Sequence, residues 1–81
     1  MIFFSIIIPV KSINDYVREN IAYIQNRLAS DWEVLISPNE HEPCEWNDGR
    51  IKIIPSGRVG PSEKRDYCAG LASGKVLVFL D

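Results

Sequence analysis

The feature that most constrains this chain is a set of short apolar runs whose hydrophobic residues follow one another directly instead of alternating. The first run, FFSIIIPV, covers residues 3–10, and the last, KVLVFL, covers residues 75–80. A strand with one face in water alternates apolar and polar residues, whereas a strand covered on both faces is apolar throughout. These runs therefore predict strands of a parallel sheet that has helices on both sides.

Two shorter apolar runs, at residues 32–36 and 51–54, predict two further strands. The polar stretch of residues 38–50 between them contains two prolines and a glycine, and predicts a loop. A helix is predicted before the second strand, because four apolar residues recur on one helical stripe: Val17, Ile21, Ile24 and Leu28. Ser12 or Asn14 can cap the start of this helix.

A second helix is predicted from residue 61 to about residue 72, after a turn at residues 56–60. Pro61 suits the first helical turn, and Gly74 suits the end of the helix. Three of the helical residues are expected to be buried: Tyr67, Cys68 and Leu71. Strands that alternate with helices require crossover connections. We therefore expect one α/β domain over residues 1–81, with a Rossmann-like parallel sheet of about four strands in the order β-α-β-β-α-β.

Composition and charge argue against several classes of partner. The chain has 81 residues and a net charge of −2, which gives no electrostatic reason to expect nucleic acid or an anionic membrane as a partner. The apolar start at residues 2–8 lacks the flanks of a signal peptide and is far shorter than the ~20 residues that span a bilayer. We expect a cytoplasmic protein with reduced Cys44 and Cys68 and no membrane segment in this chain. Membrane association of a longer form is left open.

The carboxyl ends of the predicted strands indicate where a ligand would bind, because open α/β sheets bind ligands outside those ends. The ends are four short segments: residues 9–11, 37–40, 55–57 and Asp81. No glycine fingerprint follows the first strand, which argues against dinucleotide or P-loop binding. His41, the only histidine, is expected to be solvated, and no serine has the sequence context of a hydrolase nucleophile.

Lys64 and Arg65 lie at the start of the predicted second helix, in the segment GPSEKR. A helix start favours anions, and Arg can bind two oxygens of one phosphate, so both residues are candidates for contacts with a nucleotide diphosphate. The alternative is a solvated basic helix face that Glu63 and Asp66 neutralise. Asp81 ends an apolar strand, where its carboxylate can bind a ribose hydroxyl or a divalent metal ion. For Asp81 the alternative is an ordinary polar strand end.

Three stretches of the chain together resemble the family 2 glycosyltransferases with the GT-A fold. SIIIPVKS, at residues 5–12, resembles the first strand of that family, and DWEVLIS, at residues 31–37, resembles its second strand. GPSEKRDYCAGLASGKVLVFLD, at residues 60–81, resembles the family segment G-x-x-x-A-R-N-x-G-x-x-x-A-x-G-E-x-x-x-F-L-D. This third stretch is the most specific, because several features keep their register along it. In the family it leads into the D-x-D metal motif.

The resemblance implies a UDP- or GDP-linked sugar donor, a saccharide or other acceptor, and Mn²⁺ or Mg²⁺ in the intact enzyme. It also implies that Pro9 and Val10 line the pocket of the base through their backbone. Most members end the second strand in an aspartate that reads the base. Asn39 or Glu40 would have to replace that aspartate here, so the resemblance does not fix the identity of the base.

The resemblance places Arg65, with Lys64 beside it, near the base and the diphosphate. Asp66 departs from the family pattern, because an asparagine is usual at this position. Asp81 would open the metal motif. The rest of that motif, the acceptor half and the catalytic base would lie beyond residue 81. We therefore expect the chain to be the N-terminal, nucleotide-sugar-binding half of a longer enzyme, truncated at the start of the D-x-D region and inactive alone.

Two other classes of function are weighed against this one. A non-catalytic α/β binding module would keep the fold without the activity, and the missing base-reading aspartate favours it. A receiver-type phosphoacceptor domain needs an acidic pair after the first strand, which IPVKS lacks. Whatever the function, the run at residues 76–80 contains neither proline nor charge to protect a free sheet edge, so we expect a homo-oligomer through this strand.

Overall fold

Strands and helices alternate along the chain as the sequence predicts, in a computed structural model that describes residues 1–29 and 31–80. The elements are β1 (Phe4–Pro9), α1 (Asp15–Arg27), β2 (Trp32–Ser37), β3 (Ile51–Ile53), α2 (Pro61–Leu71) and β4 (Val76–Phe79). Asp81, the predicted end of the last strand, lies outside the described residues. The polar stretch of residues 38–50 forms a long loop between β2 and β3.

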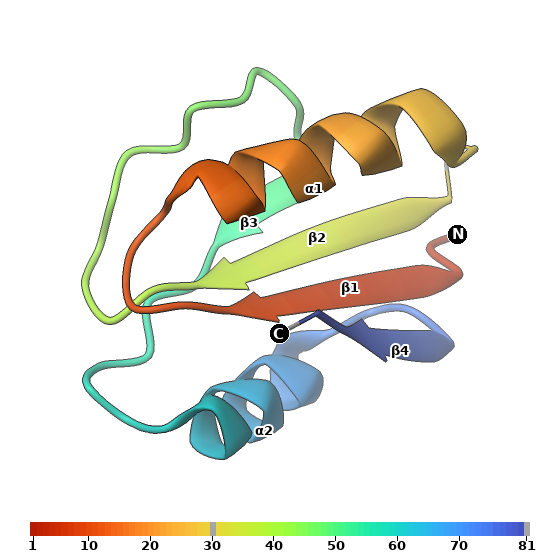
Figure 1. Ribbon diagram of the computed structural model, residues 1–81. Coiled ribbons are helices and arrows are strands. Elements are labelled where there is room, and N and C mark those ends of the chain that lie inside the picture. The colour runs from red at the N-terminus through yellow and green to blue at the C-terminus, as the bar shows by residue number, and fades with distance from the viewer. Residues whose placement is uncertain (30, 81) are drawn as a thin grey trace.

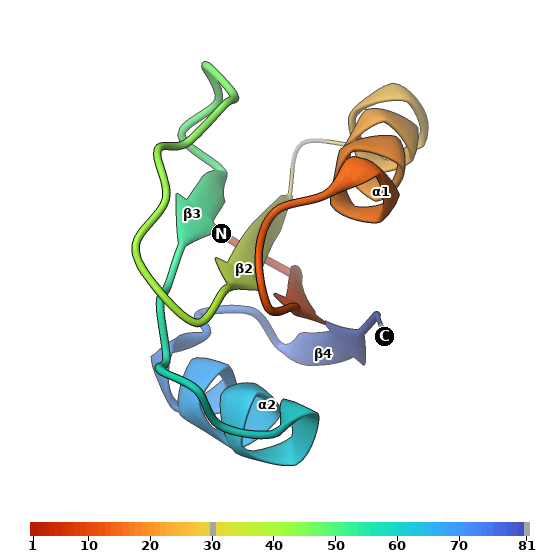
Figure 2. The same ribbon diagram turned by 60° about the vertical axis from the view of Figure 1, so that its left-hand side comes forward.

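The strands form one parallel sheet in the order β3-β2-β1-β4 (Figure 1). β1 therefore lies inside the sheet, and Phe4 at its start pairs with Trp32 of β2 and with Val76 of β4. Helix α1 covers one face of the sheet and α2 covers the other (Figure 2). This arrangement confirms the α/β class and the Rossmann-like parallel sheet, and it explains why the apolar residues of β1 and β2 follow one another without alternation.

The larger part of the core lies between α1 and the sheet. Val17, Ile21 and Ile24 of α1 are buried there, against side chains from three strands: Ile6, Ile8, Val34, Ile36 and Ile51. The side-chain oxygen of Asn14 accepts a hydrogen bond from the backbone N–H of Val17 at 3.0 Å, so Asn14 is the cap. Leu28 was expected to continue the buried stripe, but it follows the last helical residue and is 40% exposed.

The prediction for the buried face of α2 is partly wrong. Cys68 is fully buried against Ile7 and Leu35, but Tyr67 and Leu71 are 52% and 51% exposed. The second buried residue of α2 is Lys64, one turn before Cys68. Residues four apart share a helix face, so α2 turns its Lys64–Cys68 side to the sheet.

A buried carboxylate connects the amino ends of the strands. Glu33, in β2, is 1% exposed, and its oxygens accept hydrogen bonds from the Ser5 hydroxyl at 2.6 Å, the Ser73 backbone N–H at 2.7 Å and the Lys52 ammonium at 3.1 Å. Burial alone would raise the pKa of this carboxyl, but the three hydrogen bonds and the Lys52 charge outweigh burial, and the pKa lies below its usual value.

Gly74 has no room for a side chain. Its backbone N–H donates to the Ser5 hydroxyl at 2.8 Å, and a Cβ at this position would lie 2.6 Å from the Ser5 oxygen and 2.9 Å from the carbonyl carbon of Phe4. The turn between α2 and β4 therefore lies directly against β1. Gly74 was predicted only as the end of a helix; the structure shows that its smallness is also what lets β4 begin beside β1.

We predict that Glu33→Gln lowers the free energy of unfolding by about 1.5–3 kcal/mol at neutral pH, because hydrogen bonds to a charged group become bonds to a neutral one. The folded-state pKa of Glu33 is depressed, so its stabilisation is present above the unfolded pKa of about 4.3 and is lost as the pH falls through the folded pKa. Urea titrations at several pH values should therefore show that the difference in free energy of unfolding between the wild type and Glu33→Gln decreases as the pH falls. Glu19→Gln, on the exposed side of α1, is the control and should change stability little.

We also predict opposite effects for alanine at two glycines. Gly74→Ala should destabilise the fold by about 1–3 kcal/mol, because the new methyl group overlaps β1 backbone. Gly70→Ala should stabilise it by about 0.5–1 kcal/mol, because Gly70 is helical and a Cβ there meets nothing within 4 Å. Thermal unfolding of both variants checks this, and equal effects of the two substitutions would contradict the placement of the α2–β4 turn.

Candidate polar site at the carboxyl ends of the strands

The loops that leave the carboxyl ends of β1, β2 and β3 are hydrogen-bonded to one another. The backbone N–H of Asn39 donates to the carbonyl of Lys11 at 3.0 Å, and the N–H of Gly57 donates to the carbonyl of Asn39 at 2.9 Å. Ser56 N–H donates to the carbonyl of Pro38 at 3.0 Å. The ladder of the sheet thus continues past the strands, and it fixes three loops that are distant in sequence at one edge of the sheet.

Two adjoining hollows lie among these loops. One has a volume of about 310 Å³ and the other about 350 Å³. Lys11, Asn39 and Arg58 line both of them. The first hollow is otherwise lined by polar side chains: Ser12, Glu40, His41 and Glu42. Because ligands of open α/β sheets bind at this edge, this polar crevice is the candidate functional site.

The crevice contains two cations within reach of a common ligand. Lys11 follows the end of β1, and Arg58 lies in the loop between β3 and α2. Arg58 is 3.2 Å from the carboxylate of Glu40, with both side chains largely exposed at 82% and 74%. An exposed ion pair of this kind contributes little to stability and exchanges readily with other partners. The guanidinium can therefore turn from Glu40 to a bound anion without disturbing the fold.

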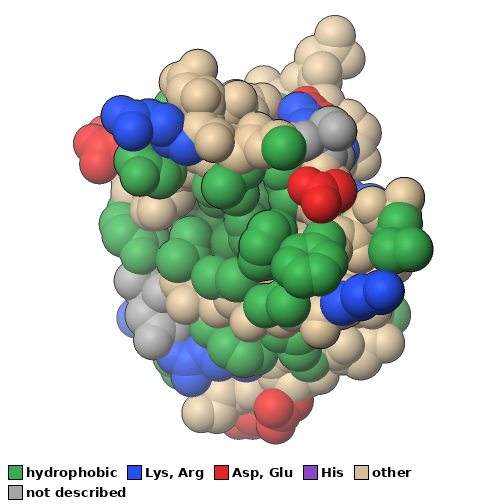
Figure 3. Space-filling view, turned by 90° about the vertical axis from the view of Figure 1, so that its right-hand side faces the viewer, with side chains coloured by type: hydrophobic (Ala, Val, Ile, Leu, Met, Phe, Trp, Pro, Cys, Tyr) green, Lys and Arg blue, Asp and Glu red, His purple; other side chains and the backbone are tan. Residues whose placement is uncertain are grey.

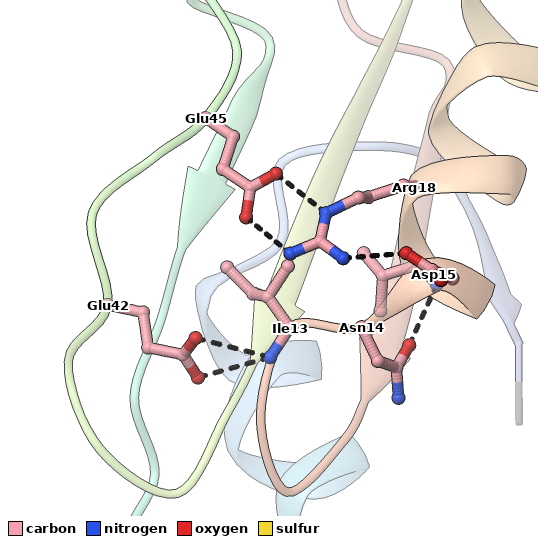
Figure 4. Close-up of polar contacts among 7 residues, drawn as sticks. Ile13, Asn14, Asp15, Arg18, Glu42 and Glu45 are labelled. Atoms are coloured by element: carbon pink, nitrogen blue, oxygen red, sulfur yellow. Dashed lines mark hydrogen bonds and ion pairs between the residues drawn. The ribbon is translucent and has the colours of Figure 1, made fainter.

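The long loop on the crevice side is held against α1 by its acidic residues (Figure 4). The carboxylate of Glu42 accepts hydrogen bonds from the backbone N–H of Ile13 at 3.1 and 3.3 Å. The carboxylate of Glu45 accepts two hydrogen bonds from Arg18, at 2.8 and 2.9 Å, and Arg18 also contacts Asp15 at 2.8 Å. These contacts hold the loop over the start of α1, next to Ser12 and Lys11.

Lys64 of α2 holds the loop between β3 and α2 through hydrogen bonds. Its ammonium donates to the Ser56 hydroxyl and to the carbonyl of Gly57, both at 3.0 Å, and the Ser37 hydroxyl donates to the same Ser56 oxygen at 2.8 Å. Burial lowers the pKa of Lys64, and burial raises the pKa of the neighbouring Cys68 thiol. Lys64 is 3% exposed, so in this structure it supports the loop that carries Arg58.

The sequence-predicted site residues divide into four groups. Asn39 and Glu40 line the crevice; Pro9 and Val10 lie just before Lys11, and Val10 N–H donates to Ser37 at 3.2 Å. Within the described part of the chain, Lys64 and Arg65 line neither hollow: Lys64 is buried beneath the loop, and Arg65 is half-buried on α2. The position of the predicted metal ligand, Asp81, lies outside the described residues.

The site residues predicted from the sequence do not include Lys11 or Arg58. Lys11 lies in the segment of residues 9–11 that is expected to face a ligand, and Arg58 directly follows the corresponding segment of residues 55–57, so their positive charge was a signal that could have been used. His41, expected to be solvated, is exposed but borders the crevice.

Over residues 1–29 and 31–80, no group of three or more His, Cys, Asp or Glu side chains is arranged to hold a metal ion. A Mn²⁺ or Mg²⁺ site remains an expectation, with Asp81 as the predicted ligand. Neither helix in this part of the chain has the length and apolar character needed to cross a membrane. Comparison with protein-family models, curated proteins and solved structures finds no match.

The burial of Cys68 behind α2 makes a direct prediction about thiol reactivity. Cys44 is exposed in the long loop, whereas Cys68 is fully buried and its thiol pKa is raised. Iodoacetamide should therefore alkylate Cys44 at the rate of a free thiol and Cys68 about 100-fold more slowly, with the difference disappearing in denaturant. Mass spectrometry of peptides from a time course measures both rates. Equal rates in the folded protein would show that α2 does not cover this face.

Proposed function

We propose that this chain binds the nucleotide diphosphate of a sugar donor, as the nucleotide-sugar-binding part of a glycosyltransferase of the family 2 type. The observation that carries the proposal is the polar crevice at the carboxyl edge of a β3-β2-β1-β4 parallel sheet. Open α/β sheets bind ligands outside the carboxyl ends of their strands, and the crevice lies there, among the loops that follow β1, β2 and β3.

The chemistry of the crevice suits a ligand with an anionic centre and polar ends. Lys11 and Arg58 supply positive charge for a diphosphate, and Arg can bind two phosphate oxygens at once. Asn39 and Glu40 supply hydrogen-bonding groups for the base or for sugar hydroxyls. In this arrangement Lys64 acts as a positioning residue, because it holds the Ser56–Gly57 turn from which Arg58 extends.

The resemblance would add a divalent metal and a catalytic base to this arrangement. When bound, the metal would stabilise the departing nucleoside diphosphate. No transfer step can be assigned to side chains of the described residues, so we expect binding without sugar transfer from the chain as it stands. Self-association through β4, which the sequence also predicts, remains a proposal that rests on the open edge of that strand.

Calorimetry with UDP, GDP and inorganic pyrophosphate, each with and without Mn²⁺, tests the proposal. We expect at least one nucleotide to bind. Arg58→Gln and Lys11→Gln should each weaken binding about tenfold or more, because each removes a charge-assisted hydrogen bond worth about 1.5–3 kcal/mol. Arg27→Gln, an exposed cation at the end of α1, is the matched control and should leave affinity unchanged.

Comparison of Arg65→Ala with Arg58→Gln distinguishes two positions for the diphosphate, one against α2 and one in the crevice. If Arg65→Ala weakens nucleotide binding and Arg58→Gln does not, the diphosphate contacts α2, as the sequence resemblance implies. If Arg58→Gln weakens binding and Arg65→Ala does not, the diphosphate lies in the crevice. Failure of UDP, GDP and pyrophosphate to bind in every condition would reject nucleotide recognition and favour the non-catalytic binding module.

A further inference from the structure

The outer edge of β4 presents unpaired backbone groups. The N–H groups of Val76 and Leu80 donate to carbonyls of Phe3 and Ile7, both at 2.9 Å, so these residues face β1. Alternate residues of a strand turn their backbone groups to opposite sides, and therefore Leu77 and Phe79 direct theirs away from β1. β4 is the last strand in the sheet order, so no described strand pairs with this side.

The side chains around this edge are apolar and exposed. Val76, Leu77 and Phe79 are 39%, 39% and 44% exposed, although hydrophobic side chains of a parallel sheet are normally covered on both faces. On the α1 side, β4 borders an apolar hollow of about 320 Å³, whose lining includes Tyr23, Leu28 and Val78. Figure 3 shows hydrophobic side chains gathered over much of one side of the molecule, with charged side chains mainly at the margins.

The two edges of the sheet differ in how they are protected. β3 spans three residues and carries Lys52, and Pro55 follows it closely. Short edge strands with lysine or proline resist pairing with another chain. β4 contains no lysine or proline, although Lys75 directly precedes it, and no residue from Val76 to Leu80 is charged. Two copies of this edge can therefore approach without repulsion between like charges.

We propose that two copies of the chain associate through β4, paired antiparallel about a two-fold axis at Val78. Only this register places Leu77 opposite Phe79 of the partner, so that the outward N–H and carbonyl groups of both residues are satisfied in hydrogen-bonded pairs. A symmetric dimer of this kind needs the same surface on both copies, and the neutral β4 edge is self-complementary. The two four-stranded sheets become one continuous sheet.

The register also determines which side chains meet. Residues directly opposite each other in an antiparallel pair lie on the same face of the sheet. Leu77 therefore contacts Phe79 of the partner on the α2 side, and Val78 contacts its own counterpart on the α1 side. The two apolar hollows then join above the paired strands, where Tyr23 of α1 and Leu28, which follows α1, line the hollow of each copy. A standard interface covers roughly 800 Å² per partner, about a sixth of the 4869 Å² surface of this chain.

The association is independent of the proposed nucleotide site. Antiparallel pairing directs the carboxyl ends of the two sheets to opposite sides of the dimer, and both crevices remain open. Substitutions in β4 should thus leave nucleotide affinity unchanged, and a chain that binds no nucleotide can still form the dimer.

Sedimentation velocity at micromolar concentrations tests the proposal on the intact chain. We expect a dimer in which the amides of Leu77 and Phe79 are protected from hydrogen exchange. Leu77→Lys and Phe79→Glu should each weaken the dimer about tenfold or more, because each buries a charge against an apolar partner. The double variant should recover association, because the introduced ammonium then faces the introduced carboxylate of the other copy. Tyr67→Lys, at a comparably exposed aromatic residue on α2, is the control.

Circular dichroism of each variant establishes that it is folded before its association is measured. A wild-type chain that stays monomeric overturns the proposal. A dimer that both single substitutions leave intact overturns it as well, because its interface is then elsewhere. A double variant that associates no better than the single variants overturns the antiparallel register.

Discussion

The carboxylate of Glu33 joins segments that the sheet ladder alone would hold weakly. It accepts hydrogen bonds from Ser5 in β1, from Lys52 in β3 and from the backbone of Ser73, which lies 40 residues further along the chain. The carboxylate thereby ties the turn before β4 to the middle of the sheet. A domain of this size has a small core, and apolar packing on the α2 side is limited to a few side chains. The outer strand β4 is thus positioned by this polar connection as well as by its backbone pairing with β1.

The amino ends and the carboxyl ends of the strands differ in how tightly they are filled. At the amino ends, Glu33, Ser5 and Gly74 form a closed arrangement in which hydrogen-bond partners are present and no space is left for a side chain. At the carboxyl ends, backbone hydrogen bonds fix the loops but leave polar side chains directed into open hollows. A rigid backbone that presents exchangeable side chains is the usual basis of a binding site. Stability and candidate function are thus separated along the strand direction.

The sequence predicted the elements well, because apolar runs and helical stripes are local signals that survive tertiary packing. The sequence-based predictions fail where a polar residue is buried and its hydrogen-bond partners are distant in sequence. Glu33 lies inside a predicted apolar run, and Lys64 was expected to contact a ligand or solvent; only the folded arrangement of Ser5, Ser73 and Ser56 makes the burial of both residues possible. The burial of Lys64 also explains why the predicted face of α2 was misplaced. Lys11 and Arg58 meet through loop pairing, which no local pattern encodes.

Lys64 connects the energetics of the fold to the geometry of the candidate site. Its hydrogen bonds to Ser56 and Gly57 are made to uncharged oxygens, and a buried ammonium in such surroundings loses part of its hydration energy. An apolar residue at this helix position would avoid that loss, but it would leave the hydroxyl of Ser56 and the carbonyl of Gly57 without this donor. The turn that carries Arg58 would then be held by the backbone hydrogen bonds of Ser56 and Gly57 and by the Ser37 hydroxyl, without the contribution of Lys64. Lys64 is therefore less favourable for burial than an apolar residue, but it helps to fix the loop that places Arg58 beside Lys11.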